Sequence, residues 1–102
     1  MRVGRPLYAW RVTLRLRFDA LDDEARRLLG VELRQYEAEV EDRDTSLVVA
    51  MTVLGHVGPA SAVGDAAQWL RYAATHADIP GAQIDAVRAV RRWIGPIAGT
   101  GA

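Results

Sequence analysis

The fold is decided by residues 7–18, which read LYAWRVTLRLRF. Large apolar side chains occupy the even-numbered positions of this stretch, and arginines recur at the odd-numbered positions. Because successive side chains of a β-strand point to opposite faces of the sheet, the pattern predicts a strand with one face in a hydrophobic core. The opposite face is expected to carry Arg11, Arg15 and Arg17.

A helix and a second strand are expected next. Asp19 or Asp22 can cap a short helix, and Gly30 is placed as its left-handed stop. Over residues 33–41 the alternation returns with acidic side chains on one parity, which predicts a strand. Its outward side chains include Glu37 and Glu39.

A third strand is expected over residues 46–55. Residues 42–45 are polar and predict a short turn, so this strand should run antiparallel to the second. The larger side chains at its odd-numbered positions are expected in the core. Its other face then carries Val48, Ala50 and Leu54.

The remaining chain predicts a helix and a last strand. Apolar residues recur at three- and four-residue steps over residues 60–77, as in an amphipathic helix. Residues 83–94 fit either a helical or a strand period. We favour a strand, because a proline and a glycine at 80–81 turn the chain after the helix.

This order of elements predicts an α+β domain with the split βαβ arrangement called ferredoxin-like, βαββαβ. Right-handed crossovers place both helices on one face of a four-stranded antiparallel sheet, with the first and third strands in the middle. The domain is expected to span residues 7–94, with a flexible leader at 1–6 and a flexible glycine-rich tail at 95–102. This fold hosts many unrelated functions, so it implies no family.

Composition narrows the functional classes. With 102 residues the chain is one domain, and without cysteine it has no disulfide and no thiolate chemistry. Thirteen arginines balance thirteen acids, so no net basic field attracts nucleic acid. The absence of lysine fits GC-rich coding and suggests a bacterium or its phage. No stretch predicts a signal peptide or a membrane span, and we expect a cytoplasmic protein.

The outward face of the sheet is the first candidate surface. On it, the acidic second strand and the arginine-bearing first strand flank the small residues of the third. Arginines and glutamates can bridge that gap within one chain, where an exposed pair contributes about 0–1 kcal/mol. Alternatively, two copies pack face to face, so that arginines of one meet glutamates of the other. RNA binding is disfavoured, because the aromatic side chains of the first strand have the parity of the core.

The second candidate surface lies on the long helix. Trp69, Tyr72 and His76 are three and four residues apart, so they neighbour one another away from the core stripe. They are interpreted either as packing at the core boundary or as a contact surface of the kind that Trp and Tyr anchor.

No arrangement predicts catalysis, a metal site or a cofactor. His76 and Asp65 lie roughly 16 Å apart along the helix, too far for a hydrogen bond, and His56 stands alone in a loop. We therefore expect a non-enzymatic protein–protein interaction or assembly domain. Its expected partner is a second copy of itself, in a homodimer, or a larger protein, while nucleic acid is disfavoured and no membrane is expected. A small-ligand sensor and, after it, an RNA-binding module are the alternatives.

Overall fold

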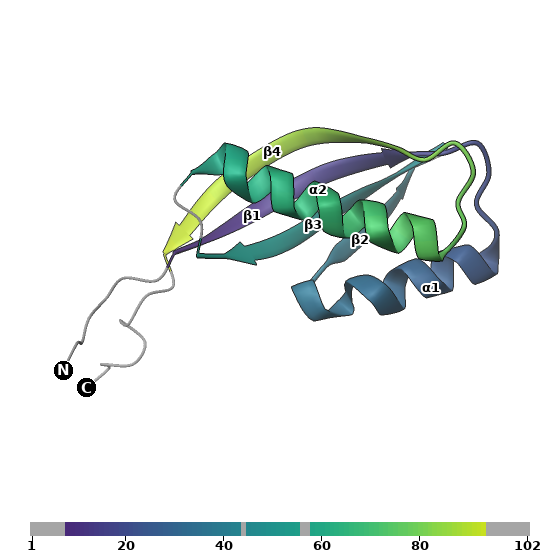
Figure 1. The fold of residues 1–102 in the computed structure, drawn as a ribbon, viewed down its shortest axis with the longest axis horizontal. Helices are drawn as coiled ribbons and strands as arrows, with labels where there is room; N and C mark the ends of the chain where they lie inside the picture. Colours follow the sequence, from purple (N-terminus) through teal and green to yellow (C-terminus); the bar gives the residue numbers. More distant parts are fainter. Residues whose placement is uncertain (1–7, 44, 56–57, 94–102) are drawn as a thin grey trace.

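The computed structural model describes residues 8–43, 45–55 and 58–93. The expected leader at 1–6, the expected tail at 95–102 and His56 lie outside these ranges. Figure 1 shows the order of elements along the chain. They are β1 (Tyr8–Arg17), α1 (Asp23–Leu33), the 3-10 helix η1 (Arg34–Tyr36), β2 (Glu39–Arg43), β3 (Ser46–Leu54), α2 (Pro59–His76) and β4 (Gln83–Trp93).

The fold is α+β, as the sequence predicts. Its four strands form one sheet in the order β2-β3-β1-β4, and every neighbouring pair is antiparallel. The expected first and third strands therefore occupy the centre. The two helices lie on the same side of this sheet (Figure 1). The other side is left without a covering element in the part of the chain that the structure describes.

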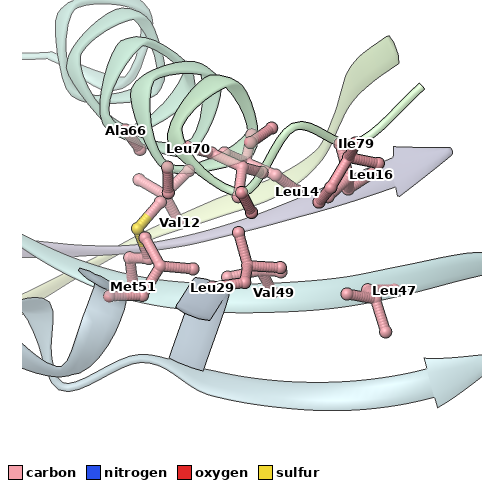
Figure 2. Packing of buried hydrophobic residues seen from close by; sticks show 14 of the residues in the cluster. Val12, Leu14, Leu16, Leu29, Leu47, Val49, Met51, Ala66, Leu70 and Ile79 are labelled. Carbon is pink, nitrogen blue, oxygen red and sulfur yellow. The ribbon is translucent and has the colours of Figure 1, made fainter. Parts of the chain in front are cut away.

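The hydrophobic core lies between the sheet and the helices. Even-numbered residues of β1 and odd-numbered residues of β3 point into it, and both helices supply its other wall (Figure 2). The predicted parities of both central strands are thus confirmed. Burying one such Leu, Ile or Val stabilises the fold by about 1.5–3 kcal/mol. Fully buried members include Val12, Leu14, Leu16, Leu29, Leu47, Val49, Met51 and Leu70.

The first helix begins as expected and ends later. The side chain of Asp22 caps it by accepting a hydrogen bond of 2.7 Å from the backbone N–H of Ala25. The prediction that Gly30 stops the helix is wrong, since the helix continues to Leu33. Leu29 and Leu33 lie one turn apart and are both buried, and this burial outweighs a cost of about 1 kcal/mol for glycine inside a helix.

The second strand starts later than the alternation indicates. Residues 34–36 form η1, and Glu37 takes a left-handed conformation with φ 54°. The strand begins at Glu39 and extends through two residues of the predicted turn to Arg43. The strand starts late because Leu33, the apolar residue with which the apparent alternation begins, is buried as the last residue of a helix.

The last element is a strand, which settles the ambiguity over residues 83–94 in favour of the prediction. It pairs with β1 along its whole length, with one register shift between Thr13 and Leu14. Before it, the backbone N–H of Asp19 donates a hydrogen bond of 2.9 Å to the carbonyl of Pro80. This bond joins the loop after β1 to the loop before β4, at the end of the sheet where β4 begins.

Candidate interaction surface

The candidate site is the side of the sheet that faces away from the helices, which we call the open face. Its members follow from the strand register, because residues paired across neighbouring strands share a face. They include Glu39, Glu41 and Arg43 of β2; Val48, Ala50, Thr52 and Leu54 of β3; Arg11, Thr13, Arg15 and Arg17 of β1; and Asp85, Arg88, Val90 and Arg92 of β4.

The middle of the open face is a row of four residues that crosses all four strands. Glu39 pairs with Ala50, Ala50 pairs with Thr13, and Thr13 pairs with Arg88. The row has an acid at one end, a base at the other, and two small side chains between them. We call these four residues the middle row. Its charged ends are exposed, and its two small side chains are half-buried.

Arg11 ties one end of the open face together. Its Nη1 donates to the hydroxyl oxygen of Thr52 at 2.8 Å and to the backbone carbonyl of Glu37 at 2.9 Å. Its Nη2 lies 3.1 Å from Oε1 of Glu39. Arg11 thus reaches across β3 to the acidic strand, which is the bridge within one chain that the sequence allowed. Of the two partners predicted on β2, Glu39 lies on the strand, and Glu37 lies before it.

Charge on the rest of the open face is only partly paired. Arg17 Nε lies 2.9 Å from Oδ2 of Asp85, and Arg43 Nη2 lies 3.2 Å from Oε1 of Glu41. Within the described ranges, Arg15 and Arg88 form no ion pair, and both side chains are exposed. Among the described residues of this face, the unpaired arginines are therefore Arg15 and Arg88 beside its centre and Arg92 at its end.

The open face also carries exposed apolar side chains. Leu54 is 56% exposed and Val90 is 45% exposed, while Val48 and Ala50 are half-buried between their neighbours. The alternation of residues 46–55 predicts this face for Val48, Ala50 and Leu54, and the register confirms it. The β4 residues could not be predicted in this way, because their face depends on the pairing of β4 with β1 and on its register shift.

A hollow of about 470 Å³ lies at the end of the open face where β3 ends. Thr52, Leu54 and Arg92 line it together with residues around η1. A polar hollow of about 280 Å³ shares Glu37, Thr52 and Arg92 with it and adds Arg11 and Glu39. Both hollows open to solvent on the same side of the sheet.

The predicted flank of the long helix turns out to face the first helix. The ring of Trp69 stacks on Tyr36, with centroids 4.2 Å apart and planes 3° apart. His76 Nδ1 lies 3.0 Å from Oε1 of Glu32. Tyr72 is 59% exposed. Two of the three predicted residues are thus engaged in packing α2 against α1 and its extension, as in the interpretation of boundary packing.

The described ranges hold neither a metal-ion cluster nor a membrane-spanning helix. Among the residues described, no group of three or more His, Asp or Glu side chains is placed to hold a metal ion. In these ranges, neither helix combines the length and the apolar character that crossing a membrane requires.

No protein-family model matches the chain, and neither a curated protein nor a solved structure matches it.

Proposed function

We propose that this protein is a ferredoxin-like, non-enzymatic association domain that forms a homodimer through its open face. The strand order β2-β3-β1-β4, with two crossover helices, supports the fold assignment. The function rests on one observation, the self-complementary middle row of a sheet face that no described element covers.

The middle row fits a second copy of itself. A twofold axis parallel to the strands and midway between β1 and β3 reverses the order of the row. Glu39 of one copy then faces Arg88 of the other, and Ala50 faces Thr13, on both sides of the axis. Such an isologous contact repeats each favourable pair twice. Two sheets packed in this way lie about 10 Å apart, so small central residues allow close approach.

The ion pairs within one chain decide which charged residues remain for contact with the second copy. The arginine row predicted to meet the glutamates of a partner is partly used within the chain, since Arg11 holds Glu39 and Arg17 holds Asp85. Arg15 and Arg88 are the cations left beside the centre. The interface therefore combines a small uncharged centre with a charged rim, which is the usual anatomy of such contacts.

Light scattering on matched variants tests the proposal. In dilute solution we expect a mass of two chains for the wild type, and a mass that falls toward one chain for Ala50→Arg, which puts a charge at the centre. Val31→Arg is the control, because Val31 is an exposed apolar residue on α1, away from the sheet. Arg15→Glu and added salt should also weaken the dimer.

Two results would contradict the homodimer. One is a wild-type mass of one chain at all concentrations, which would direct the search to a larger protein partner. The other is an Ala50→Arg variant that keeps the wild-type mass while remaining folded by circular dichroism. Where Ala50→Arg does not fold, Thr13→Glu places a charge at the neighbouring position of the middle row and serves the same comparison.

A small-ligand sensor is the second candidate, and the hollow beside Thr52 supports it. Arg92 lines both parts of that hollow and forms no ion pair with any described residue. A small carboxylate is the ligand class that the guanidinium of Arg92 suits. Titration with succinate, followed by amide chemical shifts, should move the signals of Thr52 and Leu54 in the wild type and not in Arg92→Gln. Unchanged spectra of the wild type would exclude this ligand class.

A further inference from the structure

The two outer strands of the sheet each have a free edge. β2 pairs only with β3, and β4 pairs only with β1. All five residues of β2 are exposed, and so are most residues of β4 up to Arg92. A free strand edge presents backbone N–H and C=O groups that can pair with another strand. Both edges of this sheet are accessible to such pairing within the described ranges.

The two edge strands, β2 and β4, carry opposite net charge. β2, with the sequence EVEDR, has three acids and one arginine. β4, with the sequence QIDAVRAVRRW, has three arginines and one acid. Pairing of like edges would bring acids against acids or arginines against arginines, which is unfavourable for residues directly opposite each other. Pairing of β2 with β4 joins a strand of net negative charge to a strand of net positive charge. Within one chain, the three acids of β2 also contact arginines: Glu39 contacts Arg11, Glu41 contacts Arg43 and Asp42 contacts Arg26.

Strand direction also suits the unlike pair. Every neighbouring pair in the sheet is antiparallel, so in a sheet of four strands β2 and β4 run in opposite directions. A second copy shifted sideways in the plane of the sheet therefore places its β2 antiparallel to β4 of the first. The helices of both copies then lie on the same side, and the sheet continues without a change of face.

We infer that β4 is a docking edge for β2 of a second copy of this chain, in a head-to-tail assembly. The five residues of β2 match in length the five residues Arg88–Arg92, which follow the register shift in β4. That segment holds all three arginines of the strand. Val40 and Val90, which are 42% and 45% exposed, add apolar side chains to the contact.

Such a contact is heterologous, and its consequence differs from that of a face-to-face dimer. Each copy offers one acidic and one basic edge, so association does not stop at two chains unless a ring closes. The contact uses backbone hydrogen bonds at the sheet edge and does not require a second sheet to pack on the open face. It can therefore be tested in a protein whose open face is blocked by Ala50→Arg.

The experiment uses a pair of charge-reversal variants in the Ala50→Arg background. The first, Arg88→Glu/Arg92→Glu, makes the β4 edge acidic. The second, Glu41→Arg/Asp42→Arg, makes the β2 edge basic. Each variant alone opposes its own two edges with like charge, and we expect its association constant to fall at least tenfold below that of Ala50→Arg. An equimolar mixture restores both unlike edges, so its mass should rise again.

Light scattering up to about 1 mM protein gives the masses. Amide hydrogen exchange over residues 39–43 and 88–92 gives a second measure, because edge pairing slows exchange at both strands together. A monomeric Ala50→Arg protein over the whole range would overturn the inference. So would a mixture that associates no better than its components. Thr13→Glu replaces Ala50→Arg as the background where the latter does not fold.

Discussion

The guanidinium of Arg11 and the carboxylate of Glu39 lie 3.1 Å apart although their strands, β1 and β2, are not neighbours in the sheet. The side chain of Arg11 crosses the intervening strand β3, where the hydroxyl of Thr52 accepts a second hydrogen bond. The side chain of Arg11 is only 17% exposed, whereas that of Glu39 is 83% exposed. The central strand thereby holds the acidic edge strand by a side chain as well as through β3.

Replacing Arg11 should lower the free energy of unfolding. Arg11→Met keeps the aliphatic packing but removes the hydrogen bonds to Thr52 and to the carbonyl of Glu37, and we expect a loss of about 1–2 kcal/mol. Arg15→Met is the matched control on the same strand and face, with an expected change within about 0.5 kcal/mol. Urea denaturation measures both. Equal effects of the two substitutions would show that the contacts of Arg11 do not stabilise the fold.

The stack of Tyr36 on Trp69 should appear as a coupling in a double-mutant cycle. Tyr36→Leu and Trp69→Leu each remove one ring, and their effects on unfolding free energy should be non-additive by about 0.5–1.5 kcal/mol. Tyr72→Leu combined with Tyr36→Leu is the control and should be additive, since Tyr72 is exposed. An additive result for Tyr36 and Trp69 would contradict a stabilising stack.

Two glycines should respond to alanine in opposite directions. Gly30 lies inside α1 with open space around it, so Gly30→Ala should stabilise the protein by roughly 0.5–1 kcal/mol. Gly81 has φ 70°, and an added Cβ would overlap the carboxyl group of Asp19, so Gly81→Ala should destabilise it. Thermal unfolding distinguishes the signs. A lower melting temperature for Gly30→Ala would mean that α1 ends near Gly30 in solution.

The ion pair of Glu24 and Arg27 has a consequence that titration can measure. The hydrogen bond from Arg27, together with its charge, lowers the pKa of Glu24 below its ordinary value. A lowered carboxyl pKa favours the folded state at neutral pH, and this contribution disappears as the pH falls through that pKa. Arg27→Gln should raise the pKa of Glu24 toward its ordinary value, as followed by NMR of the side-chain carboxyl. Arg34→Gln should leave the Glu24 titration unchanged.

The central strands could be predicted because their alternation is produced by the core itself. Leu14 and Leu16 in β1, and Val49 and Met51 in β3, are buried on one parity, and that parity is visible in the sequence. The cap at Asp22 was also predictable, since a side-chain oxygen before an acidic first turn is a local signal. These features depend on a few neighbouring residues.

The failed predictions lie where a tertiary contact overrides a local signal. Gly30 would end an isolated helix, but the burial of Leu33 extends α1 beyond it. Tyr36 has the parity of a strand residue, yet it lies in η1 against Trp69. Neither contact could be derived without knowing how α1 packs against α2.

The candidate surface was predictable in part for a related reason. The parity of β1 and β3 placed Arg15, Val48 and Ala50 on one face, which the register confirms. The choice between an arginine bridge within the chain and one to a partner could not be made, because it depends on the rotamer of Arg11. Arg88 could not be placed at all, since the register shift in β4 changes which residues face outward.

The position of β1 between β3 and β4 has a kinetic consequence. β2 and β3 are separated by two residues, so their ladder can close early in folding. The ladder between β1 and β4 instead joins Tyr8 to Trp93, at opposite ends of the described chain. Closing so long a loop costs chain entropy before its contacts form, and non-local pairing of this kind slows folding. Until β4 docks, β1 retains an unpaired edge beside buried-type residues, which makes the interval before docking the period of greatest risk of aggregation.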